Sequence, residues 1–286
     1  LGDQRLDVTK YVLDVGVYTR RIKARILYNH LLVSGTPKSH IQALLESNKI
    51  AKIVDHKNYN PRIIEAMTDA LRTNDIKSTN YPTAFIDALN NPSQIWDTAF
   101  RTHIDHRCQH LLIAMFFLSE YGVAFADLHS SFDKLHTMMS TAYGLPHGPK
   151  DFEEALRILE GSFIKIINIR KPVVSFINPS LKDYLSSYLF DIDFLIRLVP
   201  TAASIDWLLR LWNFVHTLGL SEVDQAKIAR ACIGMLEMIE TRPPWRPKAG
   251  DSLSLEYNDV ANSKRLRMLM DWWQLTNEQR FADSIM

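Results

Sequence analysis

Side chains that could do chemistry gather at residues 103–110, where three histidines, an aspartate and a cysteine lie close together. His106 and His110 are four residues apart, so on a helix they would share one face, as many metal ligands do. However, no glutamate stands between them to act as a general base, and Arg107 would repel a cation. We expect capping or packing roles and assign no metal site, with a ligand role as the alternative. A nucleophilic Cys108 assisted by His110 is disfavoured, because residues two apart on a helix diverge.

The sequence contains none of the glycine-rich motifs that cradle phosphates or present a nucleophile. Its 10 glycines never fall at the spacings G-x-x-x-x-G-K-[ST], G-x-G-x-x-G or G-x-S-x-G. We therefore assign no catalytic residue and expect the chain to be inactive as an ATPase when it is alone.

Composition limits the remaining possibilities. Within 286 residues, 33 Lys and Arg face 32 Asp and Glu, which gives a net charge of +1 and disfavours a large nucleic-acid-binding face. The two cysteines suit a reducing, cytoplasmic compartment. The longest apolar run, residues 111–118, is far shorter than the ~20 residues that span a bilayer, so no membrane partner is expected. Few glycines and prolines favour a mainly α fold.

The elements that must position these side chains follow from periodicity and caps. Residues 10–17 alternate as a short strand, and from residue 19 onwards apolar residues recur at helical spacing. Thr19 and Asn60 are suitable N-caps, and Pro61 suits the first position of a helix. We predict four segments: 1–18 with a lone strand, 19–102 as a bundle of short helices, 103–190 as a winged-helix domain, and 191–286 as a helical region.

The winged-helix prediction depends on the order of elements predicted after residue 103, which is three helices followed by two short strands. Helices are predicted at 104–120, 125–141 and 150–160, and two strand-like pieces at 162–169 and 173–177 would form one β-hairpin, the wing. The third helix reads KDFEEALRILE, and its acidic side chains would repel DNA phosphates. A protein-packing or regulatory winged helix is therefore favoured over a DNA reader.

Only helices are predicted in the last third of the chain, interrupted by an extended proline-rich loop at 242–247. They form a helical array that could begin a solenoid. The neighbouring residues Trp272 and Trp273 cannot both face one core, so one of them could meet a partner.

Two segments carry a resemblance to a known family. KARILYNHL followed by HKNYNPRIIEAMTD, within residues 23–69, resembles the helical lid that follows the core of STAND-class P-loop NTPases. The closest likeness is to the novel STAND NTPases, a prokaryotic group related to antiviral defence ATPases. VVSFINPSLKDYL, residues 173–185, is similar to the wing-to-helix segment of the same proteins. Together the similar segments extend over about residues 10–190. The resemblance implies that 1–18 is the last strand of a missing ATPase core, that 19–102 is a helical lid domain, and that 191–286 is a helical, sensor-like region.

The resemblance implies roles for three residues before and within one helix. A proline at the start of a lid helix packs near adenine, and Pro61 stands at that position in NYNPRIIE, with Tyr59 close by. An arginine at this helix often senses the terminal phosphate, and Arg62 is the candidate, because a guanidinium can bind phosphate bidentately. The alternative is that Pro61 only starts the helix and that Arg62 is a surface charge.

The resemblance also implies partners and a function. The parent protein would bind ATP or ADP with Mg²⁺, contain an ATPase core and an effector domain, respond to a trigger that could be a protein, and form a homo-oligomer on activation. This chain would be the lid and winged-helix part that couples ligand sensing to nucleotide state in antiviral defence or signal transduction. Because the sequence starts at Leu1 without a methionine, we expect the core to precede it. The alternatives are a self-standing helical interaction module without nucleotide binding and a DNA-binding regulator.

Overall fold

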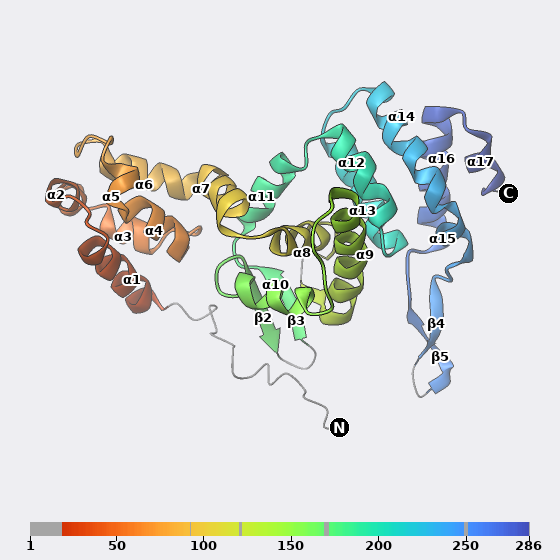
Figure 1. Ribbon diagram of the computed structural model, residues 1–286, viewed down its shortest axis with the longest axis horizontal. Coiled ribbons are helices and arrows are strands. Elements are labelled where there is room, and N and C mark those ends of the chain that lie inside the picture. The colour runs from red at the N-terminus through yellow and green to blue at the C-terminus, as the bar shows by residue number, and fades with distance from the viewer. Residues whose placement is uncertain (1–18, 92, 120–121, 169–171, 249–250, 286) are drawn as a thin grey trace. The chain divides into compact units, whose positions relative to one another are not determined.

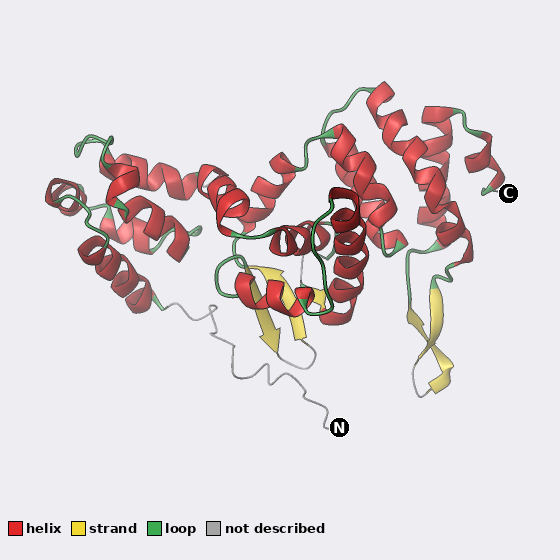
Figure 2. Ribbon diagram, viewed as in Figure 1, coloured by secondary structure: helices red, strands yellow, loops and turns green. Residues whose placement is uncertain are grey.

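The computed structural model describes residues 19–91, 93–119, 122–168, 172–248 and 251–285 (Figure 1). The fold is mainly α with a small antiparallel β component, as predicted (Figure 2). The strand predicted at 10–17, and with it the whole segment 1–18, lies outside the described residues. The chain divides into two compact units: unit 1 is Leu1–Gln109 with Glu154–Leu185, and unit 2 is His110–Glu153 with Ser186–Met286.

Unit 1 begins with a bundle of short helices that share one apolar core. The helices are α1 (Arg20–Val33), α2 (Lys38–Glu46), α3 (Ile50–Val54), α4 (Pro61–Thr68), α5 (Ala70–Thr73), α6 (Tyr81–Asn90) and α7 (Ser93–Thr98), followed by a π-helical turn, Ala99–His103. Leu27, Ile53, Ile63 and Phe85, each from a different helix, are fully or almost fully buried in this core. None of these helices is long enough to be stable alone, so the shared core holds them together.

The predicted caps of the bundle are confirmed. The Thr19 hydroxyl accepts a hydrogen bond from the backbone N–H of Ile22 at 3.4 Å, and α1 starts at the next residue after Thr19. The Asn60 side chain accepts from the N–H of Arg62 at 2.9 Å, and Pro61 is the first residue of α4. Local sequence therefore sets where these helices begin.

The middle of the chain has the element order of a winged helix. The elements are α8 (His106–Phe116), β1 (Val123–Ala124), α9 (Phe125–Tyr143), α10 (Asp151–Leu159), β2 (Ile164–Asn168), β3 (Pro172–Phe176) and α11 (Pro179–Tyr188). The predicted hairpin is confirmed, since β2 and β3 pair antiparallel from Ile164 opposite Phe176 to Asn168 opposite Pro172. The division between the units falls within α8, α10 and α11. The domain limits at 102/103 and 190/191 stay predictions.

The last part of unit 2 is a helical array. It comprises α12 (Ile192–Leu198), a 3-10 turn (Val199–Thr201), α13 (Ile205–Thr217), α14 (Glu222–Ala231), a second 3-10 turn (Cys232–Met235), α15 (Leu236–Thr241), α16 (Asn262–Thr276) and α17 (Gln279–Asp283). Helix α14 packs against both α12 and α16, and α17 packs against α16. Trp212 and Trp272 are almost completely buried and pack edge to face inside this array, while the equally buried Trp207 packs against Phe117 and donates to the carbonyl of Ala114 in α8.

A second hairpin interrupts the array where an extended loop and helices alone were predicted. Strand β4 (Trp245–Lys248) pairs antiparallel with β5 (Asp251–Tyr257), with a register irregularity next to Pro247. The extended conformation around the prolines is confirmed, but the prediction missed the pairing. Prolines cannot donate ladder hydrogen bonds, which argues against a strand from local sequence. Here β4 pairs on one side only, so they are tolerated.

Among the described residues, no helix combines the length and the apolar character that a bilayer crossing requires. The apolar run at 111–118 is instead buried protein core within and just after α8.

Candidate functional site

Arg62 lies in the first turn of α4, and its side chain reaches a segment of unit 1 that is far away in the sequence. Its Nη2 donates to the Ser162 hydroxyl at 3.1 Å, and its guanidinium carbon lies 4.6 Å from the centre of the Phe163 ring. Ser162 and Phe163 immediately precede β2. Arg62 is therefore a link between the bundle of short helices and the base of the β2–β3 hairpin.

Burial affects the Arg62 side chain in two ways. Removal from water lowers the pKa of its guanidinium, while the nearby Glu65 acts in the opposite direction. An arginine starts from so high a pKa that it stays cationic. In addition, Nε is buried without a hydrogen-bond partner among the described residues. The site thus contains a positive charge whose donors are only partly used.

Tyr59 anchors the segment before α4 to α1. Its hydroxyl donates to the backbone carbonyl of Lys23 at 2.7 Å, and the Lys23 ammonium lies 5.1 Å from the centre of the Tyr59 ring. The Tyr59 hydroxyl therefore faces backbone of α1, and the residue acts here as a structural tie.

Further contacts join the two segments that carried the sequence resemblance. The Asn178 side chain donates to the carbonyl of Asn58 at 3.3 Å and caps α11 by accepting from the N–H of Ser180 at 3.0 Å. The Ser180 hydroxyl in turn accepts from the Trp96 indole at 2.9 Å, and Trp96 belongs to α7. The segments around residues 60 and 178 are thus neighbours in unit 1.

Pro61 and Arg62 are adjacent to Tyr59 in sequence, yet the three face different surroundings. Pro61 is partly exposed at the helix start, Arg62 faces Ser162, and Tyr59 faces α1. Sequence reasoning missed Ser162, Phe163 and Asn178 as part of this site. The signal for Asn178 was the NPS triplet at 178–180, since asparagine before proline is typical of a helix start.

The histidine cluster is arranged differently from a metal site. His110 Nδ1 lies 2.8 Å from His136 Nδ1, and His136 Nε2 lies 3.0 Å from Asp151 Oδ2, all within unit 2. Both histidines are buried. The Nδ1–Nδ1 hydrogen bond requires one ring to present a bare nitrogen, so the two rings cannot both be fully protonated in this arrangement. The described residues contain no group of three metal-ligating side chains.

Cys108 lies in unit 1, where its environment suppresses thiol chemistry. The residue is fully buried, and burial raises the pKa of its thiol to about 12, with the carboxylate of Asp105 acting in the same direction. Reactive cysteines have lowered pKa values and access to solvent. Cys108 therefore belongs to the core.

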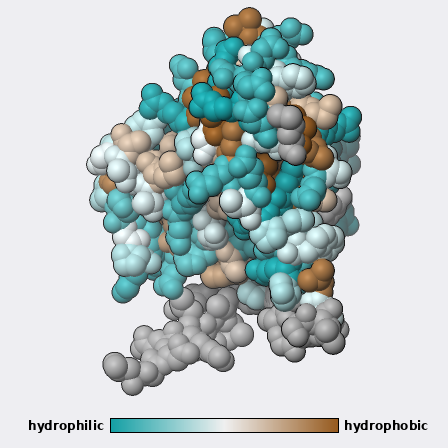
Figure 3. Space-filling model, turned by 90° about the vertical axis from the view of Figure 1, so that its right-hand side faces the viewer, coloured by the Kyte–Doolittle hydropathy of each residue, from teal (hydrophilic) through white to brown (hydrophobic). Residues whose placement is uncertain are grey.

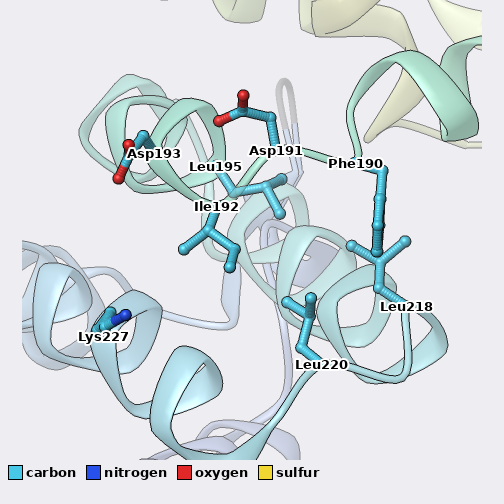
Figure 4. Close-up of a pocket in the computed structure, with 8 residues that line it drawn as sticks. All are labelled: Phe190, Asp191, Ile192, Asp193, Leu195, Leu218, Leu220 and Lys227. Atoms are coloured by element: carbon cyan, nitrogen blue, oxygen red, sulfur yellow. The ribbon is translucent and has the colours of Figure 1, made fainter.

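A surface pocket of about 380 Å³ lies in unit 2, between the start of α12, the loop before α14, and α14 itself (Figure 4). Its apolar lining comes from Phe190, Ile192, Leu195, Leu218 and Leu220, and Lys227 lies apart from these side chains. Two of its three charged groups already have structural tasks, because Asp191 caps α12 through the N–H of Phe194 and Lys227 pairs with Asp224 at 2.8 Å. No predicted site residue lines this pocket.

Comparison with known proteins gives no relative for this chain. Neither a protein-family model, nor a curated protein, nor a solved structure matches it. The class of protein must therefore be argued from the residues and their geometry.

Proposed function

We propose that this chain is the lid and winged-helix part of a nucleotide-switched STAND ATPase, and that it couples ligand sensing to nucleotide state. It works with a P-loop core that binds ATP or ADP with Mg²⁺, and the assembly is cytoplasmic and serves antiviral defence or signalling. The proposal combines the resemblance of the two sequence segments with the contacts between them.

The observation that carries the proposal is the position of Arg62. In a nucleotide switch, one side chain has to exchange a protein partner for a phosphate, because a ligand shifts an equilibrium only by binding one state better than the other. Arg62 is suited to this exchange because it is cationic, lies at a helix start and has an unused donor. Its present partners, Ser162 and the Phe163 ring, are neutral and can be given up at low cost.

Pro61 suits the neighbouring contact with adenine. It is partly exposed, its ring lacks an N–H, and the Asn60 cap holds it at the first position of α4. Tyr59 supports this turn from the other side through its bond to α1. In this proposal Pro61 and Arg62 touch the nucleotide, and Tyr59 holds their segment in place.

The test uses the polypeptide that unites this chain with its P-loop core. Replacing Arg62 by Ala should weaken ATP binding by roughly tenfold to a hundredfold, the range expected for a hydrogen bond to a charged group. Titration calorimetry with ATP and with ADP measures the effect. Arg25→Ala is the matched control, since Arg25 is an exposed arginine of α1.

Two further results would decide the matter. If Arg62→Ala binds both nucleotides as tightly as the wild type, Arg62 has no nucleotide role. If the complete polypeptide contains no P-loop and binds neither nucleotide, the chain is instead a helical interaction module, and the proposal is wrong.

A further inference from the structure

Two buried histidines of unit 2 form a chain of hydrogen bonds that ends on a carboxylate. His110 of α8 and His136 of α9, which we call the histidine pair, are 6% and 3% exposed. Their Nδ1 atoms lie 2.8 Å apart, and Nε2 of His136 lies 3.0 Å from Oδ2 of Asp151, the first residue of α10. The same oxygen accepts a hydrogen bond from the backbone N–H of Gly148 at 2.6 Å. The histidine pair therefore ties α9 to α8 and to the start of α10.

These hydrogen bonds limit the number of protons that the histidine pair can hold. An ionised carboxylate only accepts, so Nε2 of His136 carries a hydrogen. The bond between the two Nδ1 atoms needs one donor and one bare acceptor. The pair can therefore be neutral, with His110 donating, or hold one extra proton, with either ring donating. A second extra proton would turn two N–H groups towards each other and break the bond.

Burial makes a second positive charge at the histidine pair unfavourable. Hydrophilic residues cover most of the molecular face in Figure 3, and a charge on such a surface is solvated by water. The histidine pair is instead shielded from water, and the Phe132 ring stacks on that of His136 with ring centres 4.7 Å apart. The carboxylate of Asp151 can offset one positive charge. Two adjacent imidazolium rings would repel each other at this site.

Further titratable side chains lie near the histidine pair on its own helices or on elements around them. They are His129, Asp133, Lys134 and Tyr143 on α9, Asp105, His106, Arg107 and Cys108 before His110, His147 and Lys150 in the loop before α10, Glu153 on α10, and Arg197 on α12. His147 is exposed, its ring centre lies 6.2 Å from that of His136, and in acid it adds positive charge. Strand β1 and the turn Val199–Thr201, which also pack against α9, contain no titratable side chain.

We propose that the histidine pair is an acid-sensitive latch within unit 2, which is closed while the pair holds at most one extra proton and opens when a second proton enters. Opening breaks the bond between His110 and His136 and releases α9 from α8. This inference does not depend on the proposed nucleotide role.

The direction of the pH dependence follows from counting protons. In water each histidine has its ordinary pKa of about 6.5, so in the open state both rings are protonated below about pH 6. The closed pair holds at most one extra proton, so the open state binds one proton more. The closed state therefore becomes more stable as the pH rises. Below about pH 6, the ratio of open to closed molecules should increase by up to about tenfold for each unit by which the pH falls.

Hydrogen exchange of the complete chain, followed by mass spectrometry and corrected for intrinsic exchange rates, measures the opening of α9. From about pH 6 to about pH 5, opening of the wild type should increase close to tenfold. In His110→Asn the increase should be less than about twofold, because an asparagine amide can donate or accept but takes up no proton. The matched control His129→Asn removes an exposed histidine of the same helix and should behave like the wild type. Equal responses of the wild type and His110→Asn, or loss of the response in His129→Asn, would overturn the proposal.

Nuclear magnetic resonance of the wild-type chain with ¹⁵N-labelled histidines tests the proton count without any substitution. In the closed state the two Nδ1 atoms should share a single hydrogen. Signals of two imidazolium rings should appear only together with faster amide exchange in α9. If both rings of the histidine pair are imidazolium at about pH 5 while the α9 amides stay as protected as at neutral pH, the latch does not exist.

Discussion

At the scale of single residues, burial decides which side chains can react. Cys108 and His110 share a short stretch of sequence, and both are buried. The Cys108 thiol is buried, and the ring of His110 is hydrogen-bonded to His136. Arg62 is the contrasting case, because it combines a charge with a buried donor that has no partner among the described residues.

Both thiols should be inert in the folded chain. Burial raises the pKa of Cys108 to about 12 and also raises the pKa of Cys232, so at pH 8 only a trace of thiolate exists. Disulfide-exchange titration with a chromogenic reagent should detect no thiol under native conditions and two per chain in guanidinium. A thiol that reacts within seconds in the folded protein would contradict this prediction. Because the pKa values are raised, reactivity should increase as the pH rises towards 12.

At the scale of elements, local caps decide where helices start, and the structure offers a matched pair of asparagines. Asn60 precedes α4 and accepts a hydrogen bond from the N–H of Arg62. Asn80 precedes α6, but its side chain makes no capping hydrogen bond. The two positions are alike in sequence, since a proline follows each within two residues.

Replacing Asn60 by Ala should therefore lower the free energy of unfolding by about 1 kcal/mol or slightly more, because the lost cap is also buried. Asn80→Ala should change it by less than about 0.5 kcal/mol. Urea unfolding followed by circular dichroism measures both. Equal effects would mean that the Asn60 cap contributes nothing beyond ordinary helix propensity.

At the scale of the whole molecule, a buried carboxylate in unit 2 joins elements that are far apart in the sequence. Asp259, after β5, accepts hydrogen bonds from the N–H groups of Ile205 and Asp206 at 3.0 and 2.9 Å. It also pairs with Arg242 at 3.0 Å. Asp259 therefore caps α13 and fixes both ends of the β4–β5 hairpin.

Asp259→Ala should lower the free energy of unfolding by about 2–4 kcal/mol, because it leaves buried N–H groups and one arginine without their acceptor. The value should lie towards the lower end, since the Arg242 side chain is partly exposed. The control Asp206→Ala removes an exposed pair with Arg210 and should cost at most about 1 kcal/mol. Thermal unfolding by calorimetry compares the two. If Asp259→Ala lowers the free energy of unfolding no more than the control does, the hydrogen bonds and ion pair of Asp259 do not stabilise the fold.

Sequence alone was enough for the features that arise within one or two helical turns. It determined the mainly α fold, the starts of α1 and α4, and the β2–β3 hairpin. These features depend on caps, proline geometry and periodicity, all of which act between residues close in the chain.

Only the tertiary structure decided the contacts between distant segments. Arg62 meets Ser162 across 100 positions, His110 meets His136, and Trp272 rather than Trp273 faces the core. Local sequence could not predict which residues these side chains contact, because the contacts depend on how whole helices and strands pack against one another. The β4–β5 hairpin has the same cause, since its prolines argue against a strand until a partner strand supplies the hydrogen bonds.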